Sequence, residues 1–117
     1  MFILEYEDSF DAAHFLPGHD GKCANLHGHT WRVKICIESS YLGDNGMVID
    51  FGRLKEIIQL FDHANLNEKI IANPTAENIA NMISGYVLTA LAECGAPSSV
   101  VKYVNVWESE HSKIRVS

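Results

Sequence analysis

The chain has 117 residues, of which 47% are hydrophobic and 21% are charged, and its formal net charge is -6. This composition excludes a disordered chain, the acidic charge argues against general nucleic-acid binding, and no apolar run reaches the ~20 residues of a membrane-spanning helix. The length suits one hydrophobic core, so we predict a single domain over residues 1–117 with no nucleic-acid or membrane partner.

The cysteines and the first residues indicate the compartment. Three scattered cysteines are too few for a disulfide framework. The segment Met1 to Asp11 has four acidic residues and no basic one, unlike a secretory signal. The expected location is therefore cytoplasmic.

Two strands are predicted in the first part of the chain. Apolar residues alternate from Phe2, and the strand is expected to run to about Ala13. A long loop rich in proline, glycine and aspartate follows, from Phe15 to about Leu26, and long ordered loops are often functional. Alternation from Trp31 to Ile37 indicates a second, half-buried strand, which a turn at Gly43–Gly46 follows.

Two helices and two strands are predicted after this turn. Asp50 can cap a helix that begins near Phe51, and its apolar face comprises Leu54, Ile57, Ile58 and Phe61. A second helix opens at Pro74–Thr75, with Thr75 as its N-cap, and ends at Gly95 and Pro97. Strands at Val100–Trp107 and Lys113–Val116 complete the order β-β-α-α-β-β. This order predicts an α+β fold, a four-stranded antiparallel sheet with both helices on one face.

Three histidines form a candidate metal site. His27 and His29 are two residues apart, so on a strand both imidazoles point to the same face. His14 ends the preceding strand, and antiparallel pairing would bring it beside them. Three imidazoles with one open position are typical of catalytic zinc. The alternative is a turn with exposed rings.

Further polar residues are candidates for chemistry. Cys23 lies in the polar loop, four residues before His27, where a nearby cation would favour a thiolate able to act as base or nucleophile. Asp62 can orient the imidazole of His63, although the sequence alone favours the simpler explanation that the helix dipole stabilises a histidine at the C-terminus. Glu108 is either a solvated strand end or an acceptor of paired N–H donors from a ligand.

These motifs together resemble a known family. Phe10–His14, Cys23–His29, Asp62–His63, Pro74–Glu77 and Trp107–Ser109 occur in the order found in the 6-pyruvoyltetrahydropterin and 6-carboxytetrahydropterin synthases. The resemblance covers essentially the whole chain. It implies the tunnelling fold, in which a four-stranded antiparallel sheet carries two helices between its second and third strands. It also implies a homohexamer, a dimer of trimers with active sites at subunit interfaces.

The same resemblance implies roles for the candidate residues and a pterin triphosphate substrate, 7,8-dihydroneopterin triphosphate. The corresponding residues are His14, His27 and His29 for zinc, Cys23, Asp62 and His63 for proton transfer, and Glu108, Thr75 and Glu77 for the pterin. An acidic chain needs local cations to bind a triphosphate. The candidates are Lys22, His111, Lys113 and Arg115.

The spacing between Cys23 and His27 favours one branch of the family. It resembles that of the bacterial 6-carboxytetrahydropterin synthases of queuosine biosynthesis, which implies a carbon–carbon lyase that releases acetaldehyde and triphosphate. A 6-pyruvoyltetrahydropterin synthase is the alternative activity. Two further alternatives are not enzymes. One is a non-catalytic pterin- or metal-binding module, and the other is a structural domain with incidental histidines.

Overall fold

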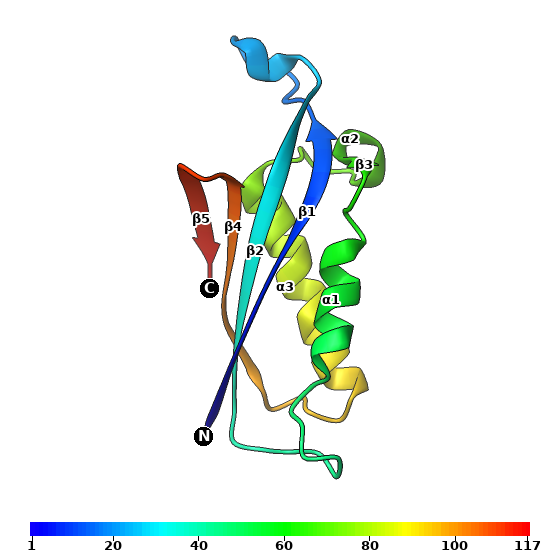
Figure 1. The fold of residues 1–117 in the computed structure, drawn as a ribbon, viewed down its shortest axis with the longest axis vertical. Coiled ribbons are helices and arrows are strands. Elements are labelled where there is room, and N and C mark those ends of the chain that lie inside the picture. The colour runs from blue at the N-terminus through cyan, green and yellow to red at the C-terminus, as the bar shows by residue number, and fades with distance from the viewer.

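Two long strands form the centre of the sheet in the computed structural model, which describes residues 1–117. β1 (Phe2–His14) and β2 (His27–Ser39) are antiparallel and paired along their whole length. β4 (Val100–Ser109) pairs with β2, and β5 (Ser112–Val116) pairs with β4, both antiparallel. The four expected strands are therefore present in one elongated molecule of 50 × 23 × 19 Å (Figure 1).

The sheet and helices differ in detail from the expected arrangement. A fifth strand, β3 (Ala64–Asn65), pairs parallel to β1, so the sheet is mixed, with the order β3-β1-β2-β4-β5. A third helix, α2 (Leu66–Lys69), follows β3 directly, and a 3-10 turn, η1 (Lys22–Ala24), lies in the long loop. The prediction of four antiparallel strands and two helices was wrong here, because such short segments carry no hydrophobic periodicity.

The two long helices begin and end where local chemistry predicts. α1 (Phe51–Gln59) begins after Asp50, whose carboxylate accepts a hydrogen bond from the Gly52 N–H at 2.7 Å. α3 (Ala76–Glu93) begins after Thr75, whose hydroxyl accepts the Asn78 N–H at 3.1 Å. It ends before Gly95, which has a φ of +85° that favours glycine.

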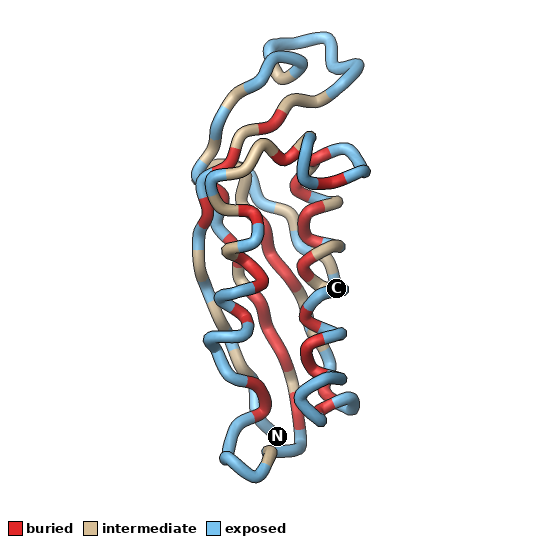
Figure 2. The backbone as a smooth tube through the Cα atoms, turned by 90° about the vertical axis from the view of Figure 1, so that its right-hand side faces the viewer, coloured by how far each residue is buried: buried red, intermediate tan, exposed pale blue.

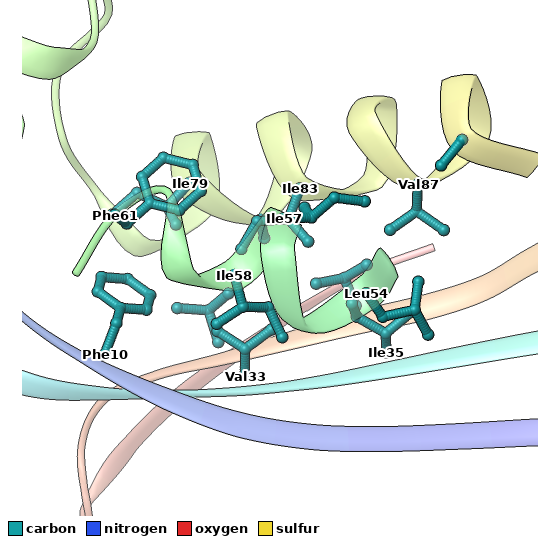
Figure 3. Close-up of a cluster of buried hydrophobic side chains, with 14 of the residues drawn as sticks. Phe10, Val33, Ile35, Leu54, Ile57, Ile58, Phe61, Ile79, Ile83 and Val87 are labelled. Atoms are coloured by element: carbon teal, nitrogen blue, oxygen red, sulfur yellow. The ribbon is translucent and has the colours of Figure 1, made fainter. Parts of the chain in front are cut away.

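Both long helices pack on one face of the sheet and form a single core with it. Figure 2 shows buried residues concentrated on the helices and strands, whereas the loop that projects beyond the sheet is mainly exposed. Figure 3 shows side chains of α1 and α3 meeting those of the strands. The labelled contributors are Phe10, Val33, Ile35, Leu54, Ile57, Ile58, Phe61, Ile79, Ile83 and Val87.

One end of the molecule gathers the functional candidates. The end of β1, the start of β2, β3 with α2, the start of α3 and the β4–β5 turn all lie at the end from which the loop projects (Figure 1). None of the helices combines the length and the apolar character that crossing a bilayer requires. The core therefore supports a polar cluster at the rim of the sheet.

Candidate metal centre

The register of β1 and β2 brings the three histidines together. His14 lies directly opposite His27, and Ala12 lies opposite His29. Paired residues and residues two apart share a face, so all three imidazoles project from the helix-covered face of the sheet. Their ring centroids are 4.5–5.1 Å apart, and the small Ala12 side chain leaves space opposite His29. β2 begins at His27, earlier than the alternation from Trp31 suggests.

Backbone carbonyls set the orientation of two of these rings. Nδ1 of His14 is 2.7 Å from the Pro74 carbonyl oxygen, and Nδ1 of His27 is 2.7 Å from that of Asn25. A carbonyl only accepts, so Nδ1 of each ring is the donor. Nε2 of each neutral ring then carries the free lone pair, which is the arrangement a metal ligand needs.

Glu108 completes the cluster from the neighbouring strand. It lies two residues beyond Val106, a core residue of β4, and therefore on the same face as the imidazoles. Its Oε1 is 3.4 Å from Nε2 of His14 and 3.1 Å from Nε2 of His29. One potential ligand atom from each of these residues and from His27 lies within 4.8 Å of the others. The cluster can therefore hold a metal ion.

The buried nitrogen atoms fit a metal better than an internal hydrogen-bond network. Nε2 of His14 and Nε2 of His29 are buried and have no hydrogen-bond partner, since their contacts with Glu108 lack the required geometry. Unpaired buried polar atoms are rare in folded proteins and costly to leave unsatisfied. A bound cation would satisfy both atoms at once.

The protonation of His29 is compatible with metal binding. Burial lowers the pKa of His29 below its ordinary value of 6.5. Glu108 opposes this shift, while the nearby His14 and His27 add to it. Because metals bind the neutral imidazole, the lowered pKa favours the binding-competent form at neutral pH.

Trp31 forms the apolar wall of the cluster. Its side chain is fully buried, and its ring lies edge-on to His14 and His29 at centroid distances of 4.8 and 5.5 Å. Its indole N–H donates to the Ala12 carbonyl at 3.3 Å. Trp31 therefore restricts the rotation of both imidazoles and shields them from solvent.

Cys23 lies beside the cluster, as the sequence predicts. It lines a cavity of about 320 Å³ together with Lys22, His27, His29 and Glu108. Its thiol is partly buried and forms no disulfide. η1 and the hydrogen bond from the Leu16 N–H to the Cys23 carbonyl at 2.7 Å hold this part of the loop over the histidines.

Asp62 and His63 are brought together, but away from Cys23. Asp62 accepts the Asp11 N–H at 2.9 Å with one oxygen, and the other lies 3.5 Å from Nε2 of His63. The backbone N–H of His63 donates to the Asp11 carbonyl at 2.6 Å, which holds His63 at a φ of +54°. His63 is 83% exposed and lines a different cavity, which also includes His29.

The predicted pterin residues occupy the other side of Glu108. Glu77 and Glu108 line another cavity, of about 410 Å³, together with His111 and Lys113. Thr75 caps α3 next to Pro74, whose carbonyl orients His14. Thr75 thus supports the cluster through the backbone.

The candidate triphosphate cations separate into two groups. Lys22 lines the cavity of Cys23, and His111 and Lys113 line the cavity of Glu77. Arg115 is not with them, because its side chain donates to Asn105 at 2.8 Å and stacks on Tyr103 at 3.8 Å. Arg115 lines a separate cavity instead.

Several supporting groups were not predicted. Pro74 and Asn25 orient the histidines through their backbone carbonyls, so the residue types at these positions do not indicate this role. Trp31 was assigned only to a strand, although its position two residues after His29 places it on the same face. The expected partner of Glu108 is the pterin. Its contact with the histidines is not visible in the spacing along the chain.

Comparison with known proteins identifies the family of the chain. The family model for 6-pyruvoyl tetrahydropterin synthase matches residues 3–117. A 6-carboxy-5,6,7,8-tetrahydropterin synthase of Synechocystis sp. is 38% identical over 107 residues, covering 83% of this chain and 80% of that protein. A dihydroneopterin monophosphate aldolase of Pyrococcus furiosus is 38% identical over 108 residues, covering 88% and 86%.

The fold has a counterpart among solved structures. The 6-pyruvoyl tetrahydropterin synthase of Caenorhabditis elegans superimposes with a TM-score of 0.78 at 26% identity, covering 99% of this chain and 94% of that one. The matched residues include every member of the histidine cluster. The chain therefore belongs to the 6-pyruvoyl tetrahydropterin synthase family and has a tetrahydropterin synthase type of function.

Proposed function

We propose that the chain is a zinc-dependent 6-carboxytetrahydropterin synthase. It would convert 7,8-dihydroneopterin triphosphate to 6-carboxy-5,6,7,8-tetrahydropterin with release of acetaldehyde and triphosphate, as in queuosine biosynthesis. The observation that carries the proposal is the cavity in which Cys23 meets His27, His29 and Glu108 beside two unpaired imidazole nitrogens. The Synechocystis relative named for this activity supports the choice.

The metal would be held by His14, His27 and His29. Three imidazole nitrogens suit zinc, and the carbonyl partners of His14 and His27 provide the outer support that such ligands need. When bound, zinc supplies Lewis-acid polarisation of substrate oxygens.

Proton transfer is assigned to Cys23, Asp62 and His63. Sγ of Cys23 would accept a proton from the substrate side chain bound in the cavity that Cys23 lines with His27, His29 and Glu108. Nδ1 of His63 would exchange a proton with the substrate, with the Asp62 carboxylate beside Nε2 orienting the imidazole.

Substrate recognition is assigned to the residues that line the cavities of Cys23 and of Glu77. The Glu108 carboxylate would accept two N–H groups from the pterin edge, with Glu77 and the Thr75 segment lining the pocket. Lys22, Lys113 and His111 would face the triphosphate. Phosphate binding by so few cations predicts an affinity that falls with ionic strength.

We also propose that the active unit is a homohexamer with sites between subunits. Cys23 and His63 line different cavities in one chain, which supports a site that two copies complete together. β3 and β5 are the edge strands of the sheet, and such edges need partners. Mixing Cys23→Ala chains with His63→Ala chains tests this, since some mixed sites would regain both groups and activity.

Product analysis by mass after incubation with dihydroneopterin triphosphate tests the activity. Loss of a general acid or base typically costs 10²–10⁴-fold, so we expect Cys23→Ala to lower kcat by at least about 100-fold while zinc stays bound. Cys94→Ala, which removes an exposed thiol at the end of α3, is the matched control and should retain activity. Full turnover by Cys23→Ala would refute the assigned base.

The relatives define two alternative outcomes of the same assay. A pyruvoyl product without acetaldehyde would assign the activity named for the Caenorhabditis elegans protein. Turnover of dihydroneopterin monophosphate in preference to the triphosphate would assign that of the Pyrococcus furiosus relative. Zinc and pterin binding with no turnover would indicate a binding module.

A further inference from the structure

We propose that Glu108 is an exchangeable fourth ligand of the metal centre. It would bind the metal while the pterin pocket is empty and leave it when a pterin occupies that pocket. This inference rests on the proposed function, because it adds a second role to the residue assigned there to the pterin.

The distances around Glu108 match those of a tetrahedral site. In a tetrahedron with metal–ligand distances of about 2.0–2.1 Å, neighbouring ligand atoms are about 3.3–3.4 Å apart. Oε1 of Glu108 lies 3.4 Å from Nε2 of His14 and 3.1 Å from Nε2 of His29. Oε1 therefore lies at a ligand-to-ligand distance from two of the three imidazole nitrogens, and all four candidate ligand atoms lie within 4.8 Å of one another.

The chemistry of the contact between His14 and Glu108 favours a cation between the two atoms. Nδ1 of His14 donates to the Pro74 carbonyl, so Nε2 of the neutral ring is an acceptor. A carboxylate oxygen is also an acceptor, and two acceptors at 3.4 Å repel each other. A metal ion resolves the contact by binding both lone pairs.

Glu108 lies between the metal cluster and the cavity of Glu77. It lines the cavity of Cys23, His27 and His29, and it also lines the cavity of Glu77. Its side chain is 30% exposed, so rotation of the carboxylate is not blocked by the core. The same group can therefore reach two partners.

The two partners compete for the carboxylate. Bidentate acceptance of two N–H groups turns both oxygens of Glu108 toward the pterin edge and so away from the imidazole cluster. Binding of the pterin ring would thus free a coordination position only when a substrate is present to use it. In the empty enzyme the same carboxylate would keep unrelated ligands away from the metal.

Metal titration of three proteins tests this inference. Wild type, Glu108→Gln and Glu110→Gln are stripped of metal, checked for folding by circular dichroism, and titrated with Zn²⁺ and with Co²⁺. Glu110→Gln is the matched control, because it removes an exposed carboxylate two residues away. Loss of outer-shell partners alone costs 10–100-fold in metal affinity, so we expect at least about 10-fold weaker zinc binding by Glu108→Gln and no change in Glu110→Gln.

The visible spectrum of the Co²⁺ protein reports the ligand exchange directly. Glu108→Gln should differ from wild type, whereas Glu110→Gln should match it. Adding unsubstituted pterin, which has the N–H edge but no side chain to reach the metal, should shift the wild-type spectrum toward that of Glu108→Gln. Equal zinc affinities and equal spectra in all three folded proteins would overturn the inference. That result leaves the proposed lyase intact if turnover persists, whereas a wild type that binds no zinc would refute the proposed function itself.

Discussion

Replacing the buried His14 by leucine should separate metal binding from folding. The change removes one hydrogen bond, Nδ1 to the Pro74 carbonyl, which is worth about 0.5–1.5 kcal/mol. It also removes an unpaired buried nitrogen, Nε2, whose burial costs about 1–3 kcal/mol. The two effects oppose each other, so the free energies of unfolding of the metal-free variant and the metal-free wild type should agree within about 2 kcal/mol.

Zinc should stabilise the wild type far more than the variant. At a free zinc concentration about 100 times the Kd, binding contributes about 2.7 kcal/mol to the free energy of unfolding. For 117 residues the entropy of unfolding is about 0.25 kcal/mol per degree, so this corresponds to a rise in Tm of about 11 °C. A variant that binds about 100-fold more weakly would gain only about 0.4 kcal/mol, or about 2 °C, at the same concentration.

Thermal unfolding followed by circular dichroism, with chelator and with zinc, measures both quantities. His111→Gln is the matched control, because it removes an exposed imidazole that is outside the cluster. Its rise in Tm with zinc should equal that of the wild type. A rise of about 11 °C in His14→Leu would show that the metal binds elsewhere and would refute the assignment of the cluster.

Three individual contacts lead to further predictions. Thr75→Ala should cost about 1 kcal/mol in urea denaturation and weaken zinc binding, because the cap of α3 positions the carbonyl that orients His14, whereas Thr75→Ser should retain both. Burial and the hydrogen bond to Asp8 raise the pKa of Tyr6 from 10.0 to about 12, so the unfolded chain loses this proton first and stability should fall as pH rises between these values. Absorbance titration of phenolate should show this late step in the wild type and not in Tyr6→Phe. His63→Gly should leave stability unchanged or raise it by up to about 1 kcal/mol, since glycine accepts the φ of +54°, while kcat falls. A large loss of stability in His63→Gly would show instead that the imidazole has a structural role.

Local patterns in the sequence determined the main elements. Alternation marked the two long strands β1 and β2, and apolar residues three and four apart marked the two long helices. Asp50 and Thr75 were predicted as caps and act as caps, because a cap bonds to a backbone group only two or three residues away. Such signals depend on residues that are near one another in the chain, so the sequence alone carries them.

The spacing of the histidines also predicted that their imidazoles cluster. His27 and His29 share a face because strand geometry repeats every two residues. The position of His14 opposite His27 followed from the expectation that the two strands pair across the loop, and the register shows this pairing.

Only the tertiary structure decided which groups complete the site. The contact of Glu108 with the imidazoles depends on the pairing of β4 with β2, which is a register between distant segments. The separation of His63 from Cys23 depends on the hydrogen bonds that hold Asp62 and His63 on β1. The short strand β3 pairs with the free edge of β1, and no local pattern encodes that edge. Pairing between distant strands is set by the folded core as a whole, and this is why residues that are ordinary in the sequence acquire partners in the site.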